Sequence, residues 1–419
     1  MASLLPLYRL IKCSNCGGDI ILQGVHLICK ECSARYGFRD FVPDMLPLAM
    51  RFISREVDKR NDYADKFPVA PCEVKYAGQW LAKQLQIDEE KIKWGKEEVF
   101  RHQLAYVVKL SPDMGLGFQG KRLMAGMLGA RNMSFRYKSK IADQLSASGL
   151  ASGYEAYEDI LLRQQIDNAV NAGDVALIEI GSGVGRLLHE YGTCMSHTRE
   201  LSDSGLRYRR FAPAFYGYKP NYEEHLRLLI GIDFEQRMID KSVGWLDRSG
   251  LSYLLRSRIL QIRALATKLN IDLDLGVKKV VTILFQTLGN QLGERLQIAM
   301  LRKAKEFASP NGIVFVSVFN KEFFKEQAEG YYTSIKASVG RIAYCNDGVF
   351  LSDKGVFSVW FEANQLKRLF KLAGMENVTV LDGQELKVFP EYDQYVPIQD
   401  QKKYKKRAII AIAPVRARD

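Results

Sequence analysis

The sequence predicts an α/β protein in which a mostly parallel sheet follows a small cysteine-rich unit and a helical segment. Three observations support this prediction. Two Cys-x-x-Cys pairs lie near the N-terminus, helix-favouring residues dominate the next stretch, and apolar runs then alternate with helical patterns. We therefore expect a unit at residues 1–47, a helical segment at 48–170 and a sheet-containing core at 171–419.

The composition is that of a folded globular protein with an excess of basic residues. Hydrophobic residues make up 47% and charged residues 26% of the 419-residue chain, which suffices to bury a sizeable core. No apolar run approaches the roughly 18 residues that a membrane span needs, and no signal-peptide pattern is present, so we expect a cytoplasmic protein. The net charge of +12 would attract phosphates, anionic membranes or acidic proteins, or would only keep the protein soluble.

The four N-terminal cysteines have the spacing of a structural zinc site. Cys13 and Cys16 form one pair, and Cys29 and Cys32 form the other. Each pair can turn both sulfurs toward one point, and two such turns complete a tetrahedron of thiolates that suits Zn²⁺. Four sulfurs leave no open position for a catalytic water, so the ion would stabilise the fold. The alternatives are a redox dithiol, which normally occurs once and opens a helix, or a metal sensor.

The residues around these cysteines predict a zinc ribbon of short antiparallel strands. Apolar runs at 20–22 and 25–28 flank Gln23-Gly24, which predicts a hairpin, and residues 36–38 predict a third short strand. The stretch at 36–46 resembles the ending of small zinc ribbons that are fused to, or partnered with, methyltransferases. This resemblance implies such a unit here.

The segment at 48–170 is rich in residues that favour helices. Residues 78–92 and 96–110 predict two helices, and residues 154–170 predict the helix that leads into the core. The glycine-rich stretch at 113–120 is either a plain or lid-like loop or a cradle for a phosphate. We therefore interpret this segment as a helical cover with the potential of a lid.

A glycine-rich turn after an apolar strand marks the centre of the core. Residues 175–180 predict a buried parallel strand, which runs into Glu179-Ile-Gly181-Ser182-Gly183-Val-Gly185 at the opening of a helix. Glycines let the backbone turn tightly and approach a ligand closely. A second apolar strand ends at Asp233-Phe234, where a carboxylate can accept hydrogen bonds from both hydroxyls of a ribose. The alternative role for Asp233 is that of a helix N-cap.

The later apolar runs complete a seven-stranded, Rossmann-like sheet. Residues 259–264, 280–285 and 313–319 predict the third, fourth and fifth strands. Residues 378–381 and 407–413 predict an antiparallel hairpin at the sheet edge. In such sheets ligands bind at the carboxyl ends of the strands.

The order of these motifs resembles that of class I S-adenosylmethionine (SAM) dependent methyltransferases over residues 171–415. The resemblance implies that the glycine turn accommodates the methionine part and the ribose of SAM, with an acid near the amino group. Ala264 stands where family members place an adenine-binding Asp-Ala pair, although Arg263 replaces the acid here. The cofactor-binding residues that the resemblance implies are Glu179, Gly181, Ser182, Gly183, Gly185, Asp233, Phe234, Ala264 and Gln286.

The motifs also narrow the class of methyl acceptor. The fourth strand lacks the Asn/Asp-Pro-Pro-Tyr/Phe motif that aligns base amines, and it lacks the Pro-Cys nucleophile used on pyrimidines. Residues 287–290 resemble a Thr-Ile-Gly-Asn motif of methyltransferases that trimethylate histidine in ergothioneine synthesis. This resemblance implies that Asn290 binds the substrate. Tyr331 and Tyr332 follow the fifth strand, where a lid could close.

An insertion at 194–227 separates the first two strands of the core. It places Arg209 and Tyr216 among arginines and aromatic residues, which can stack on a ring and hold a phosphate or carboxylate. The alternative is a surface loop whose aromatic residues only pack together. His189 and His197 are either candidate bases or ordinary helix and loop residues.

We therefore predict SAM-dependent methyl transfer to an N or O atom of a small metabolite or a peptide side chain. One alternative is an RNA methyltransferase that uses the ribbon, the basic surface and the basic run at 402–407. The other alternative is a non-catalytic protein of the same fold that binds a partner through the ribbon.

Overall fold

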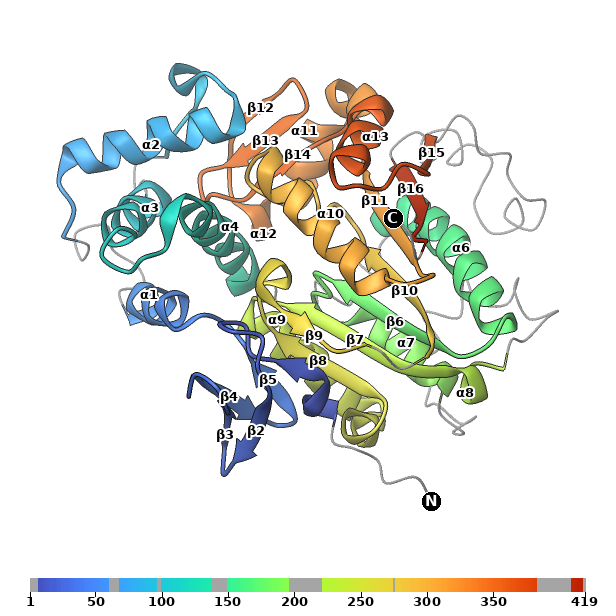
Figure 1. Cartoon of the computed structure of the whole chain (residues 1–419). Helices are drawn as coiled ribbons and strands as arrows, with labels where there is room; N and C mark the ends of the chain where they lie inside the picture. Colours follow the sequence, from blue (N-terminus) through green and yellow to red (C-terminus); the bar gives the residue numbers. More distant parts are fainter. Residues whose placement is uncertain are drawn as a thin grey trace.

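A central sheet forms the middle of the fold (Figure 1). The computed structural model describes residues 7–59, 68–95, 99–136, 149–195, 221–273, 276–382 and 408–416. The strands of the α/β core are β6 (Val175–Ile180), β7 (Leu226–Asp233), β8 (Ile259–Arg263), β10 (Lys278–Ile283), β11 (Ile313–Phe319), β15 (Thr379–Asp382) and β16 (Ala408–Pro414).

These strands lie side by side in the order β8-β7-β6-β10-β11-β16-β15. The first five are parallel, and β16 runs antiparallel between β11 and β15. The expected seven-stranded Rossmann-like sheet with an antiparallel edge is thus confirmed. The expected bounds of β6 and β11 match the structure, and β10 begins and ends two residues earlier than expected.

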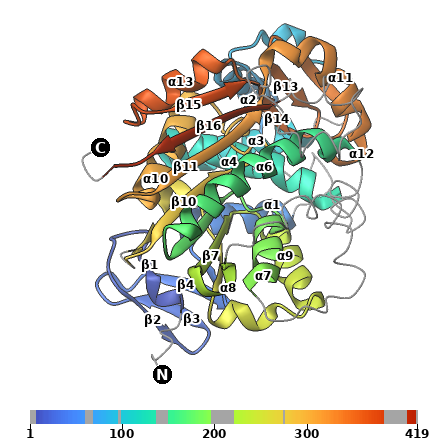
Figure 2. The ribbon, with the colours of Figure 1, turned by 90° about the vertical axis from the view of Figure 1, so that its right-hand side faces the viewer.

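Helices cover both faces of this sheet, as Figure 2 shows. One face carries α10 (Glu294–Ala308) and α13 (Ala363–Leu372), and the other carries α6 (Gly149–Asn171), α7 (Arg186–Met195) and α9 (Gln236–Arg248). Every residue of β6 is buried. Its alternate side chains enter the two different cores, which is why this strand reads as an uninterrupted apolar run.

The N-terminal unit has the ribbon fold that its sequence predicts. Its elements are η1 (Leu7–Leu10), β1 (Ile11–Lys12), β2 (Ile20–Gln23), β3 (His26–Cys29), β4 (Arg35–Arg39) and β5 (Val42–Asp44). Strands β2, β3, β4 and β5 form an antiparallel meander, and the hairpin turns at Gly24 with a φ of 59°.

The ribbon continues the central sheet, which the sequence did not reveal. β5 lies parallel to β8, so that one sheet of 11 strands runs from β15 to β2. The Met45 amide donates to the Arg263 carbonyl over 2.7 Å, and β1 pairs with the short strand β9 (Asn270–Ile271). The ribbon therefore shares a hydrophobic core with the α/β part.

The first part of the helical segment, residues 48–136, lies over the carboxyl ends of the strands. Its helices are α1 (Leu48–Lys59), α2 (Pro71–Leu85), η3 (Glu89–Lys91), α3 (Val99–Leu110) and α4 (Gly117–Arg136). Their core includes Leu265, which follows β8, and Leu292, which follows β10, and Phe234 packs against it. The second half of the glycine-rich stretch at 113–120 forms the first turn of α4 rather than a loop.

A small three-stranded sheet between β11 and α13 completes this upper layer. It consists of β12 (Ile342–Asn346), β13 (Val349–Ser352) and β14 (Phe357–Val359), preceded by η8 (Lys321–Phe323), α11 (Phe324–Ser334) and α12 (Lys336–Val339). Short connecting elements elsewhere are α8 (Tyr222–His225), η6 (Ser252–Arg256) and η7 (Ala266–Lys268). Among the helices of the described ranges, none is both long and apolar enough to cross a membrane.

Candidate functional site

The glycine turn and Asp233 meet at the carboxyl ends of β6 and β7. The Gly181 amide donates to the Ile232 carbonyl over 2.8 Å, which ties the turn to the neighbouring strand. The Gly183 amide donates to Asp233 Oδ2, also over 2.8 Å. Two motifs that lie 50 residues apart in the sequence therefore form one site.

The turn is enclosed at its ends and open in its middle. A Cβ added at Gly181 would lie 2.4 Å from Thr287 Cγ2, and one at Gly185 would lie 2.0 Å from Ser242 Oγ. A Cβ at Gly183 would meet no atom within 4 Å. The open side at Gly183 lets a ligand approach the backbone closely, while the close contacts at Gly181 and Gly185 fix the path of the turn.

The Asp233 carboxylate is held in place by the backbone and keeps acceptor capacity. Its Oδ1 accepts the Glu235 amide over 2.9 Å, and its Oδ2 accepts the Gly183 amide. Burial raises the pKa of Asp233 above its usual value, while these amide donors act in the opposite direction. The Phe234 amide is a further backbone donor to this carboxylate, which has about four lone-pair sites, so acceptor capacity remains for a hydroxyl donor. The N-cap of α9 is Glu235, so the alternative role of Asp233 as an N-cap is wrong.

Ser182 faces the protein interior. Its Oγ accepts a hydrogen bond from Gln261 Nε2 over 3.1 Å, and Ser242 Oγ donates to Gln261 Oε1 over 3.3 Å. Gln261 is completely buried on β8 and holds the glycine turn in place through its bond to Ser182. The sequence signal for Gln261 was a single polar residue inside an apolar strand.

Three further expected residues line the same region of the fold. Glu179 is 5% exposed and precedes the glycine turn on β6. Ala264 is buried, and its amide donates to the Asp233 carbonyl over 2.8 Å. Phe234 packs against the core of the helical segment. The structure thus brings these residues to the carboxyl ends of β6, β7 and β8.

The side chain of Gln286 is engaged by the protein itself. Its Nε2 donates to Ser358 Oγ over 2.9 Å and to the Val359 carbonyl over 2.5 Å, and its Oε1 accepts the Phe319 amide over 2.7 Å. These bonds join the turn after β10 to β11 and β14. The expectation that this side chain binds the cofactor is therefore corrected to a role in holding three elements together.

A buried carboxylate that the sequence analysis missed lies at the end of β10. Glu158 of α6 is 0% exposed and pairs with Arg186 Nη2 over 2.5 Å. It also accepts the Phe285 amide over 3.1 Å and contacts the Ser317 hydroxyl. Because a buried charge needs a partner, this network fixes the start of α7 against the end of β10. No local pattern marks Glu158, since its partners come from distant segments.

The expected substrate residues fall into different environments. Asn290 is exposed in the turn after β10, and its amide donates to the Gln286 carbonyl over 3.1 Å. The Tyr331 ring is partly buried and packs on Phe319 with 5.5 Å between ring centroids. The remaining expected substrate residues, Arg209 and Tyr216, lie outside the described residues, as do residues 196–220, including His197, and the basic run at 402–407.

Tyr332 belongs to the core, so its expected lid role is wrong. It is 3% exposed and stacks on Phe350 with 3.5 Å between ring centroids. Its hydroxyl accepts a hydrogen bond from Trp360 Nε1 over 2.9 Å. Tyr332 and Tyr331 are adjacent in the sequence, but the turn of α11 separates a core side chain from one that is partly exposed.

His189 is a neutral core histidine rather than a candidate base. It is 7% exposed, stacks on Trp245 with 4.2 Å between ring centroids, and hydrogen-bonds Ser249 Oγ over 2.7 Å. Burial lowers the pKa of His189 to about 4. At neutral pH the ring therefore carries no charge.

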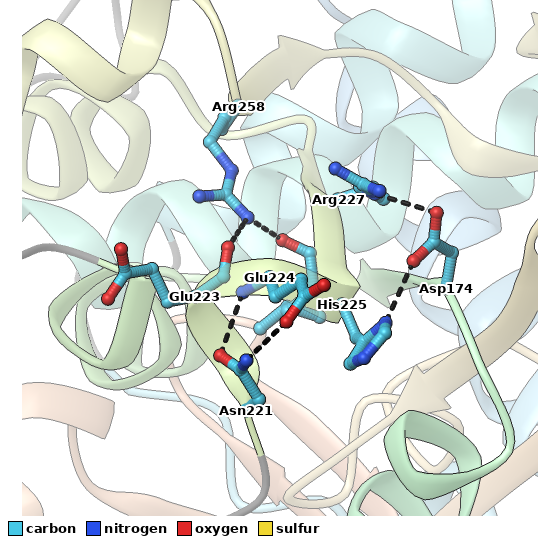
Figure 3. Close-up of polar contacts among 8 residues, drawn as sticks. Asp174, Asn221, Glu223, Glu224, His225, Arg227 and Arg258 are labelled. Carbon is cyan, nitrogen blue, oxygen red and sulfur yellow. Dashed lines mark hydrogen bonds and ion pairs between the residues drawn. The ribbon is translucent and has the colours of Figure 1, made fainter.

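A polar cluster occupies the opposite edge of the sheet. Figure 3 shows Asp174 between His225 Nδ1, at 3.0 Å, and Arg227 Nε, at 2.7 Å. Asp174 precedes β6, His225 is the last residue of α8, and Arg227 lies at the start of β7. Arg258 anchors the same corner by donating to the Glu223 carbonyl over 2.9 Å. This cluster therefore fastens the amino ends of the strands and lies away from the glycine turn.

The four expected metal ligands converge in the ribbon. Their ligand atoms all lie within 4.8 Å of one another, with 3.6 Å between Cys13 and Cys32 and 3.4 Å between Cys16 and Cys29. Zinc–sulfur bonds of about 2.3 Å in a tetrahedron require sulfur separations of about 3.8 Å. The geometry and the all-thiolate donor set therefore fit a closed structural zinc site.

No protein-family model matches the sequence, and no curated protein matches it. Solved structures with a similar fold include a SAM-dependent methyltransferase from Clostridium acetobutylicum, which is 10% identical. The match covers 66% of this chain and 98% of that one, with a TM-score of 0.38.

The methyltransferase CcbJ from Streptomyces caelestis is 16% identical, and the match covers 63% of this chain and 90% of that one with a TM-score of 0.34. Phosphoethanolamine N-methyltransferase 2 from Haemonchus contortus, in complex with SAM, is 12% identical. That match covers 65% of this chain and 59% of that one, with a TM-score of 0.33. At identities of 10–16% this likeness concerns the fold alone.

Proposed function

We propose that this protein transfers a methyl group from SAM to an N or O atom of a small metabolite or a peptide side chain. The observation that carries the proposal is the hydrogen bond between the Gly183 amide and Asp233 Oδ2. It places an open glycine backbone beside a fixed carboxylate at the carboxyl edge of a parallel sheet, where ligands of this fold class bind.

The residues of this edge suit the parts of SAM. The open side of Gly183 fits the methionine part and the ribose, and the remaining acceptor capacity of Asp233 suits the ribose hydroxyls. Glu179, two residues before Gly181, supplies negative charge toward the amino group of the cofactor. SAM itself supplies an activated methyl group, so the protein needs to hold an acceptor atom in line with it.

The turn after β10 is our candidate for holding the acceptor. Thr287 lies directly against the glycine turn, because a Cβ at Gly181 would come within 2.4 Å of its Cγ2. Asn290 is exposed three residues further on and can offer both a donor and an acceptor. Phe285 and Gln286 precede it with φ values of 44° and 69°, a strained backbone of the kind that often marks functional sites.

The ribbon would bind one zinc ion through Cys13, Cys16, Cys29 and Cys32. The ion would have no open position, so it would stabilise the ribbon and thereby strand β5, which pairs with β8, without taking part in methyl transfer.

The test is transfer of tritiated methyl groups from SAM into fractionated cell extract by the purified protein. Label in small-molecule or peptide fractions that resists RNase, and that the D233N variant does not produce, would support the proposal. Label that disappears after RNase treatment would instead favour the RNA methyltransferase. The net charge of +12 is consistent with that alternative, because basic surfaces attract the phosphates of RNA. Absence of SAM binding by calorimetry would favour the non-catalytic alternative.

A further inference from the structure

Three side chains from three separate segments form a row along the carboxyl edge of the sheet. Asp233 on β7 pairs in register with Arg263 on β8, and Arg263 pairs in register with Asp44 on β5. Residues in one register of parallel strands point to the same face, and neighbouring strands lie about 4.8 Å apart. Asp44 of the ribbon therefore lies about 10 Å from Asp233, a separation comparable to the length of a nucleoside.

Arg263 links the ribbon to the site. Its Nη1 pairs with Asp44 Oδ2 over 3.0 Å, and its Nε donates to the Phe234 carbonyl over 3.3 Å. The Asp44 side chain is 22% exposed and that of Arg263 is 15% exposed. Both side chains are therefore mostly buried, but a ligand can still contact them. Asp44 Oδ1 accepts the Leu46 amide over 3.2 Å, which fixes the carboxylate while leaving further lone pairs free.

The order of the strand ends sets the direction in which an adenosyl group would lie. The glycine turn follows β6 and Asp233 ends β7, so a ribose held by Asp233 directs its base toward β8 and β5. The 6-amino group of adenine is a donor and needs an acceptor. Arg263 cannot serve, because a guanidinium only donates, whereas the Asp44 carboxylate only accepts.

We infer that the zinc ribbon supplies part of the cofactor site: Asp44 accepts the 6-amino group of the adenine of SAM, and Arg263 positions Asp44. This inference depends on the proposed binding of SAM. It gives the ribbon a role in selecting the nucleoside, in addition to its stabilising role. It also explains why a basic residue is compatible with the end of β8, because the acid arrives from the neighbouring strand.

The test compares S-adenosylhomocysteine with S-inosylhomocysteine, in which a carbonyl oxygen replaces the 6-amino group. We expect the wild-type protein to bind the adenosyl compound about 10- to 100-fold more tightly by calorimetry, the range for a hydrogen bond to a charged group. In D44N and D44S the preference should fall to about threefold or less, because the Asn amide can also donate to the carbonyl and Ser no longer offers the carboxylate.

The matched control is D40N, which makes the same change in the same ribbon. Asp40 is exposed and pairs only peripherally with Arg39 at 3.1 Å, so D40N should keep the wild-type preference. Zinc content and melting temperature, measured for all variants, report the integrity of the ribbon. A preference retained in D44N and D44S, or an equal loss of affinity for both nucleosides, would overturn the inference while leaving SAM binding intact. Failure of the wild-type protein to bind either compound would overturn the proposed function and this inference with it.

Discussion

The two halves of the carboxyl edge are assembled in different ways. The half formed by β6 and β7 consists of two neighbouring strands: β6 continues directly into the glycine turn at Gly181–Gly185, and β7 ends at Asp233. The half formed by β8 and β5 joins two segments 219 residues apart through the pair of Arg263 and Asp44. The first half is encoded in local patterns, whereas the second exists only after the chain has folded.

This difference shows where a short motif is sufficient and where it is not. An apolar strand followed by glycines fixes its own turn, because the backbone conformation that the turn needs is a property of those residues. The ion pair at β8 depends on a parallel strand contributed by a different unit. The basic residue at the end of β8, Arg263, is therefore explained by the acid that the neighbouring strand contributes, Asp44.

The largest expected effect comes from disrupting the β8 and β5 half through the four-cysteine cluster of the ribbon. We expect C29S to abolish zinc binding and to unfold the ribbon, because structural zinc contributes about 10 kcal/mol or more to such small units. Hydrogen exchange should then show loss of protection in β2–β5 and in β8, whose edge β5 covers. Metal analysis and exchange mass spectrometry measure both effects.

The matched control for C29S is C72S, since Cys72 is an exposed cysteine on α2 outside the cluster. It should retain the metal and the protection. Retention of both in C29S as well would show that the four sulfurs are not a zinc site.

A smaller effect is expected from breaking the first half at Asp233. We expect D233N to weaken binding of S-adenosylhomocysteine by about 100-fold, because hydrogen bonds from ribose hydroxyls to a charged acceptor contribute about 1.5–3 kcal/mol each. Calorimetry measures the change. The control is D240N, which alters an exposed acid on α9 and should change the affinity by less than twofold. An unchanged affinity in D233N would remove the residue from the cofactor site.

Much of the fold and the centre of the site follow from the sequence for a common physical reason. Strands buried on both faces, such as β6 and β11, are long apolar runs, so their bounds can be predicted from the sequence. The glycine turn and the cysteine pairs can be recognised in the sequence because few other residue types can adopt the same backbone conformation or bind a metal in the same way. These patterns depend only on neighbours in the chain.

The parts that could not be predicted depend on contacts between distant segments. Glu158 and Gln286 look like ordinary polar residues of a helix and a turn, and their roles come from partners on other elements. Tyr331 and Tyr332 are adjacent and have the same side chain, so the sequence does not show which of them is buried. The packing of α11 against Phe350 buries Tyr332. The pairing of β5 with β8 also depends on contacts between distant segments and could not be predicted from the sequence.

A third expected effect concerns stability next to the glycine turn. His189 has a folded-state pKa of about 4 against an ordinary value of 6.5, so the unfolded chain binds the proton more readily. Stability should therefore fall as the pH is lowered from about 6.5 to 4, by up to about 3 kcal/mol from this residue. Denaturant unfolding of the wild-type protein and of H189F across this range measures the difference. The variant should show a shallower dependence, and parallel curves would contradict a neutral, buried imidazole.

The smallest expected effect separates the two edges of the sheet. D174N disrupts the cluster at the amino ends of β6 and β7, where the carboxylate is about one-third exposed at 34%. Because exposed ion pairs contribute about 0–1 kcal/mol, unfolding by denaturant should show a loss of that size at most. Binding of S-adenosylhomocysteine should not change, since the glycine turn lies at the other ends of these strands. The same Asp-to-Asn change at Asp233 should weaken binding strongly, so equal effects on affinity at both positions would mean that the ligand does not select the carboxyl edge.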